Sequence, residues 1–93
     1  MAPQALALFN GEFTRECARS FASRIRKEVG EEPSTEIERA FHLAFTRTPT
    51  ESERAASLAF LDSQRTIRDG DADAALTDFC HTLLNASELI YPD

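Results

Sequence analysis

Arg47 is the polar residue whose position in the sequence is most distinctive. It follows an amphipathic segment and precedes Thr48-Pro49, where a helix should end. A cation at a helix C-terminus is stabilised by the helix dipole, by roughly 0.3–1 kcal/mol when it is exposed. The guanidinium can also hold a carboxylate through two hydrogen bonds, and Glu53 and Glu88 are the candidates. We therefore predict an Arg47 ion pair within the fold and favour it over a ligand-binding role.

Histidines and cysteines, the usual metal ligands and nucleophiles, are few in this chain. His81 follows Cys80 directly, and adjacent helical residues point about 100° apart, so they do not converge on one ion. We interpret His42 and His81 as structural or surface residues, in preference to a catalytic base or metal ligand. Cys17 and Cys80 lack the spacing of a metal site and are expected to be buried free thiols. The alternative is a disulfide between them, which requires their helices to be neighbours.

The segment Asp69–Asp73 resembles the opening of a calcium-binding loop. Such a loop needs glycine at its sixth position and glutamate at its twelfth, where this chain has Ala74 and Cys80. A helix break with capping aspartates is therefore the better interpretation. No serine lies in a Gly-x-Ser-x-Gly motif, and no glycine-rich phosphate loop is present in the sequence. The sequence predicts no catalytic residue, no metal site and no cofactor.

Amphipathic helices must position these groups. The first long helix should span residues 12–29, and its large apolar residues are Phe13, Cys17, Phe21, Ile25 and Val29, with Ala18 and Ala22 beside them. The next should begin at Ser34 or Thr35, because Thr35 and Glu38 have the spacing of a capping box. Its apolar face consists of Ile37, Ala40, Phe41, Ala44 and Phe45.

Two further helices should follow the Thr48-Pro49 turn. Thr50 and Glu53 form a second capping box, which opens a helix that runs to about Arg68. The broad apolar surface predicted for this helix consists of Ala55, Ala56, Leu58, Ala59, Phe60, Leu61 and Ile67. Asp71 or Asp73 should cap the last long helix. The apolar face of that helix consists of Leu76, Phe79, Cys80, Leu83 and Leu84.

The whole pattern predicts an all-α fold: a small bundle of four main helices. A short N-terminal helix over residues 3–9 and a helical turn over 88–91 should complete it. Because chains of this length form a single core, we expect one domain over residues 1–93. The segment from Pro3 to Phe9 already has the composition of a packed interior, which suggests a fragment of a larger protein.

The balance of charges disfavours nucleic-acid and membrane partners. Sixteen acidic and ten basic residues give a net charge of −6, and a negative domain repels phosphate backbones and anionic lipids. Basic residues gather between positions 15 and 27, but glutamates are interleaved with them, so we interpret this as a solvated helix face. No segment has the length and hydropathy of a membrane span. We therefore expect no binding to nucleic acid and no membrane insertion.

Three segments resemble a known family: Pro3–Asn10 with Phe13; Ala40–Thr50 with Glu53 and Leu58–Leu61; and Asp78–Asp93. Together they are similar to the C-terminal end of the planctomycete-specific domain of unknown function. That domain occurs in large exported bacterial proteins, often with cytochrome-c-like modules upstream. Its Arg-x-Pro-Thr turn matches Arg47, Pro49 and Thr50. Its Leu-Leu-Asn-x-x-Glu-Phe ending matches Leu83–Asn85 and Glu88, with Leu89 in place of Phe.

The resemblance implies a context and no reaction. The haem-attachment motif of the upstream modules is absent from this sequence, so the resemblance implies no haem here. We expect a non-catalytic structural or interaction module whose parent lies in the periplasm or cell envelope. Its partners would be other domains of the parent, or a protein or polysaccharide. The candidate structural or partner-contact residues are Arg47, Glu53, Glu88 and Tyr91.

Two alternatives belong to other classes of protein. The first is an accessory part of an enzyme or redox protein, in which Arg47 or His42 would contribute to an active site formed by missing upstream domains. The second is a helix-turn-helix DNA reader. It is disfavoured because the helix after Pro49 opens with Glu51 and Glu53, which repel phosphate.

Overall fold

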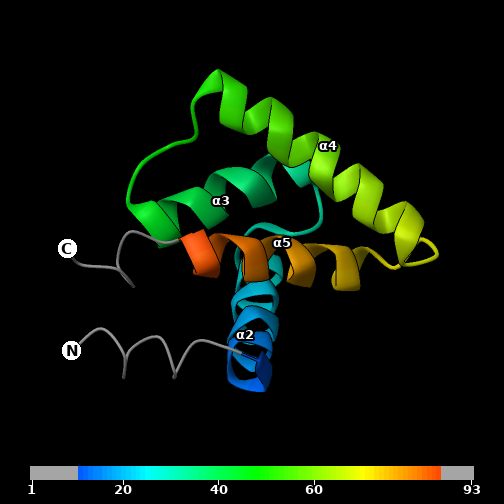
Figure 1. Ribbon diagram of the computed structural model, residues 1–93. Helices are drawn as coiled ribbons and strands as arrows, with labels where there is room; N and C mark the ends of the chain where they lie inside the picture. The colour runs from blue at the N-terminus through cyan, green and yellow to red at the C-terminus, as the bar shows by residue number, and fades with distance from the viewer. Residues whose placement is uncertain (1–10, 87–93) are drawn as a thin grey trace.

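The structure is a computed structural model that describes residues 11–86, and these residues form four α-helices and no strands (Figure 1). The helices are α2 (Gly11–Val29), α3 (Pro33–Phe45), α4 (Glu51–Ile67) and α5 (Ala72–Ala86). The predicted all-α bundle of four main helices is therefore confirmed. The predicted short helix over 3–9 and turn over 88–91 lie outside the described residues.

Helix α5 lies at the centre of the arrangement. It packs against each of the other three helices, and α2 and α4 lie on different sides of it (Figure 1). Its buried apolar residues are Ala75, Leu76, Phe79, Cys80 and Leu83. They meet the buried face of α3, which consists of Ile37, Ala40, Phe41 and Ala44, while Phe45 packs at its edge. The apolar faces predicted for α3 and α5 thus form the core.

The buried face of α2 differs from the predicted one. Its fully or nearly buried residues are Thr14, Ala18, Ala22 and Ile25. Phe21 and Val29 pack only at the margin of the core, and Phe13 is 50% exposed. Small side chains at the contact allow two helix backbones to approach closely, and the alanines therefore occupy the centre of the interface that α2 forms with the bundle. The predicted face was centred on the large apolar residues, whereas the buried face is centred on Ala18, Ala22 and Ile25.

The start of α3 also differs from its prediction. The helix begins at Pro33, and Glu32 is its N-cap, because the Glu32 carboxylate accepts hydrogen bonds from the backbone N–H and the hydroxyl of Thr35 at 3.0 and 2.9 Å. Proline suits the first turn because its missing N–H would have no helical partner there. The predicted Thr35–Glu38 capping box is therefore wrong. Glu38 instead pairs with Arg54 of α4.

Helix α4 is capped as predicted but buried less than predicted. Thr50 is its N-cap and forms a complete capping box with Glu53. Among its residues only Ser57 and Leu61 are buried, and most of the predicted apolar surface is exposed: Ala55, Ala56, Leu58, Ala59 and Ile67. Phe60 packs against the core beside Phe79, and the remaining apolar residues of the helix face outward.

The connection from α4 to α5 confirms one of the two predicted caps. Asp71 accepts a hydrogen bond from the backbone N–H of Ala74 at 3.0 Å and so caps the start of α5. The other candidate, Asp73, is 78% exposed and pairs with Arg26 instead. A carboxylate three residues before the N–H that donates to it has the usual N-cap geometry.

Thr14 provides a test of the α2 interface. It is fully buried, and within residues 11–86 its hydroxyl has no hydrogen-bond partner. A buried hydroxyl without a partner costs about 1–3 kcal/mol, whereas valine has the same shape and no polar atom. We predict that Thr14→Val raises the free energy of unfolding by about 1 kcal/mol, measured by urea denaturation.

Thr77→Val is the matched control. Thr77 is also buried, but its hydroxyl donates to the Asp73 carbonyl at 2.9 Å, so the valine should give no gain in stability. If Thr14→Val gives no greater stability than Thr77→Val, relative to the wild type, this account of the interface is contradicted.

Candidate functional site

The turn between α3 and α4 is built around Arg47. Its two terminal nitrogens donate to the two Glu53 carboxylate oxygens, Nη1 to Oε1 at 2.8 Å and Nη2 to Oε2 at 2.9 Å. The predicted Arg47 ion pair is confirmed, and Glu53 is a partner. The guanidinium also lies over the rings of Phe41 and Phe45, 5.7 and 5.4 Å from their centroids, where cation–π attraction adds to the ion pair.

Glu53 serves two structural purposes at once. Its Oε1 accepts the Arg47 hydrogen bond and also the backbone N–H of Thr50 at 2.9 Å, which closes the capping box. The Arg47 hydrogen bond, followed by that of Thr50, lowers the pKa of Glu53 to about 2. The carboxylate is thus held in its charged form, and the turn joins the end of α3 to the start of α4. The other two candidate residues, Glu88 and Tyr91, lie outside the described residues.

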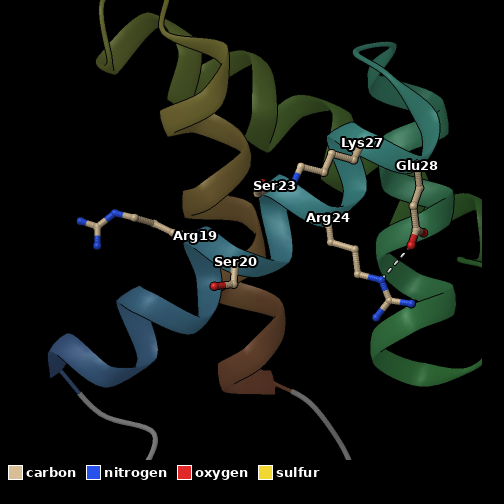
Figure 2. A pocket seen from close by; sticks show the side chains of 6 residues that line it. All are labelled: Arg19, Ser20, Ser23, Arg24, Lys27 and Glu28. Carbon is tan, nitrogen blue, oxygen red and sulfur yellow. Dashed lines mark hydrogen bonds and ion pairs between the residues drawn. The ribbon is translucent and has the colours of Figure 1, made fainter.

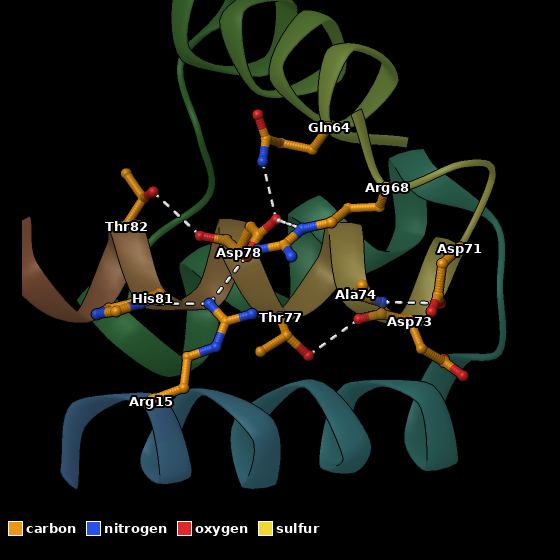
Figure 3. A network of polar contacts seen from close by, with 10 residues as sticks. All are labelled: Arg15, Gln64, Arg68, Asp71, Asp73, Ala74, Thr77, Asp78, His81 and Thr82. Carbon is orange, nitrogen blue, oxygen red and sulfur yellow. Dashed lines mark hydrogen bonds and ion pairs between the residues drawn. The ribbon is translucent and has the colours of Figure 1, made fainter. Parts of the chain in front are cut away.

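A second cluster surrounds Asp78 at the centre of the bundle (Figure 3). The Asp78 side chain is 8% exposed. Arg68 donates to both of its oxygens at 2.8 Å, and Gln64 donates to Oδ2 at 2.8 Å. Arg15 contributes a third partner, with Nη1 2.8 Å from Oδ1. One buried carboxylate therefore joins α2, α4 and the loop after α4 to α5.

The electrostatics of this cluster follow from its donors. Burial alone would raise the pKa of Asp78, but the hydrogen bonds from Arg68, Gln64 and Arg15 outweigh it and lower the pKa to about 2. Asp78 is thus an ionised carboxylate with its acceptor sites occupied. His81, one turn further along α5, has Nδ1 3.4 Å from the same Arg15 nitrogen (Figure 3).

Glu36 is a second buried carboxylate, at the other end of α2. It is 3% exposed and accepts from Arg26 Nε at 3.0 Å. Arg26 also pairs with Asp73 at the start of α5, at 2.8 Å. Burial raises the pKa of Glu36, and the nearby Arg26 charge opposes that rise only in part. Arg26 therefore joins α2 to α3 and α5, whereas Arg15 joins the opposite end of α2 to α5.

Sequence reasoning missed both buried carboxylates and treated Arg15 and Arg26 as part of a solvated face. A signal was present in α5. In the sequence, Asp78 lies between Leu76 and Phe79 on the predicted apolar segment of this helix, so a carboxylate there should meet partners from other helices. The identity of those partners depends on the packing of helices that are distant in sequence.

The outer face of α2 carries a shallow groove of about 560 Å³ (Figure 2). It is lined by Arg19, Ser20, Ser23, Arg24, Lys27 and Glu28. All six belong to α2, so the groove lies between neighbouring ridges of one helix. Neither Arg47 nor His42 lines it, and His42 is exposed on α3.

The thiols are free, as predicted. Cys80 is fully buried, whereas Cys17 is only partly buried. Burial, with a smaller contribution from the Glu36 charge, raises the pKa of Cys80 to about 12. Because the thiolate is the reactive form, Cys80 behaves as a small apolar core residue.

Within the part of the chain that the structure describes, no three His, Cys, Asp or Glu side chains come together in a way that could hold a metal ion. Over the same residues, no helix combines the length and apolar character that crossing a bilayer requires.

These features define a small all-α domain whose polar clusters join helices. Residues 1–61 match the family model PSD1, described as a protein of unknown function (DUF1553), and the chain belongs to this family. No curated protein and no solved structure matches the chain.

Asp78 gives a testable prediction for this architecture. Asp78→Asn keeps the size of the side chain but removes the charge that Arg15 and Arg68 share. Loss of one partner from a buried ion pair costs about 3–5 kcal/mol, so we expect a decrease of that size in the free energy of unfolding. Glu16→Gln, which removes the exposed partner of Arg19, should change it by less than about 1 kcal/mol.

The pH dependence supplies a second readout. The pKa of Asp78 in the folded state, about 2, is below its ordinary value of 3.8. Its contribution to stability is therefore complete above about pH 4 and is lost as pH falls towards 2. Chemical denaturation across this range should show a smaller acid-dependent loss in Asp78→Asn than in the wild type. Equal pH slopes would show that Asp78 does not supply this stability.

Proposed function

We propose that this domain is a non-catalytic structural and interaction module of a larger exported bacterial protein. The proposal rests on the pairing of the buried carboxylates. Asp78 directs its carboxylate oxygens at donors from three different parts of the chain, and Glu36 is paired with Arg26. A carboxylate that acts as a general acid or base must present an oxygen to the reacting atoms. In this domain the carboxylates join helices.

Membership of the PSD1 family supports a more specific proposal about the source of this chain and its position within the family's domain. We infer that the family is specific to planctomycetes and that this chain is the C-terminal part of its domain, folded as one unit over residues 1–93. The segment Leu83–Asn85 with Glu88 supports this placement because it resembles the end of the family pattern. The parent would lie in the periplasm or cell envelope, and the partners would be its other domains or a polysaccharide.

The alternative role, an accessory part of an enzyme or redox site, requires Arg47 or His42 to face a shared cleft. Arg47 is engaged with Glu53, and the groove of α2 contains neither residue. The geometry therefore favours the interaction module.

Calorimetry tests the proposal directly. The 93-residue chain would be titrated into the remainder of its parent protein, expressed separately, and into cell-wall polysaccharide. We expect saturable binding to at least the parent protein. An absence of binding to both, together with full activity and unchanged stability of the parent after deletion of this domain, would contradict the proposed function.

A further inference from the structure

Positive charge is concentrated on α2 in an otherwise acidic chain. This helix carries five of the ten basic residues and three of the sixteen acidic ones. Two of its arginines, Arg15 and Arg26, face inward and neutralise the buried carboxylates. The other three basic residues, Arg19, Arg24 and Lys27, line the outward groove (Figure 2).

The cations of this surface outnumber the carboxylates that they contact. Glu28 is shared by Arg24 at 2.9 Å and by Arg39 of α3 at 2.7 Å. Arg19 pairs with Glu16, and both side chains are more than half exposed. Within residues 11–86, no carboxylate pairs with the exposed Lys27. Three of these four cations thus share two carboxylates, and the fourth has none among the described residues. We name Arg19, Arg24, Lys27 and Arg39 the basic face.

The shape of the basic face suits a helix. The groove runs between the row of Arg19, Ser23 and Lys27 and the row of Ser20, Arg24 and Glu28, and the small serine side chains in these rows allow a close approach. Grooves between residues four apart are those into which the ridges of a second helix pack. Arg19 and Lys27 lie eight residues apart, or roughly 12 Å along the axis, which two to three helical turns of a partner span.

We propose that the basic face docks an acidic helix of a neighbouring domain of the parent protein. The partner would supply the carboxylates that the basic face lacks, placed one or two helical turns apart. This inference rests on the proposed function, because it requires a partner domain, and it specifies which surface of the present domain is used.

The arrangement of charges favours a helix over a sulfated or phosphorylated polymer. Glu16 and Glu28 lie among the cations and would repel closely spaced anionic groups. A helix can instead place a single carboxylate beside Lys27, which no carboxylate within residues 11–86 contacts. Because exposed ion pairs are weak individually and screened by salt, the contact should be moderate in affinity and sensitive to ionic strength.

An NMR titration tests the proposal. The probe is an alanine-based helical peptide of about 20 residues, roughly 30 Å long, with glutamate at every fourth position. We expect the backbone amide signals of Ser20, Ser23 and Lys27 to shift most. Raising the ionic strength from about 0.1 to about 1 M shortens the screening length from about 10 to about 3 Å, and affinity should fall at least about tenfold.

Two charge-reversal variants distinguish binding at the basic face from a general electrostatic attraction between the peptide and the protein. Lys27→Glu should weaken peptide binding about tenfold, the equivalent of about 1.4 kcal/mol. Arg65→Glu makes the same charge change at an exposed position on α4 and should leave binding within about twofold of the wild type. Circular dichroism would verify that both variants keep the wild-type fold.

Equal effects of the two reversals, or shifts centred on another helix, would overturn the proposal. Stronger binding to dextran sulfate than to the peptide would also overturn it, in favour of a polyanion site. If the parent protein binds the wild type and Lys27→Glu equally well in calorimetry, the proposed function stands and this docking surface fails.

Discussion

Burial of the Asp78 charge at the centre of the bundle is the constraint on which the other contacts depend. Removing a carboxylate from water costs several kcal/mol, so the ionised group must recover that energy from donors placed around it. Those donors come from α2, from α4 and from the residue after α4. Any rotation of α2 or α4 about its own axis would withdraw Arg15 or Gln64 and remove one of the donors that stabilise the charge. The positions of two helices relative to α5 are thereby restricted.

The same principle acts at the far end of α2, where Arg26 meets Glu36 of α3. Between the two ion pairs, Ala18 and Ala22 bring α2 close to its neighbours. Apolar burial supplies most of the driving force for folding, whereas the ion pairs select one arrangement among those that would bury a similar area. Charge placement thus contributes specificity to a core built largely from alanine, leucine and isoleucine.

Local interactions were predictable from the sequence, and interactions between distant segments were not. The helices themselves, the Thr50–Glu53 cap and the Arg47 pair depend on residues within about two turns of one another, where spacing determines contact. The prediction of the α3 cap was wrong because two local signals competed. Pro33 favours the first turn and displaced the start that Thr35 and Glu38 indicate. The predicted burial of α4 was wrong for a different reason. Apolar composition does not reveal how much of a helix its neighbours cover.

The Asp78 and Glu36 clusters depend on which helices become neighbours, and helical periodicity carries no information about that. Arg15 and Arg26 resemble Arg19 and Arg24 in the sequence, yet the first two point inward and the second two outward. This division separates structural cations from exposed ones. Inward arginines hold the fold together, and outward cations leave a positive surface on an acidic member of the PSD1 family.

Native-state hydrogen exchange tests the central role of α5 most directly. If α5 is held by all three neighbours, its amides between residues 75 and 83 should exchange only through global unfolding, with a free energy equal to that from denaturation. Amides on the outward side of α4 should exchange at lower free energy. Exchange of α5 through a partial opening while α4 stays protected would contradict the account.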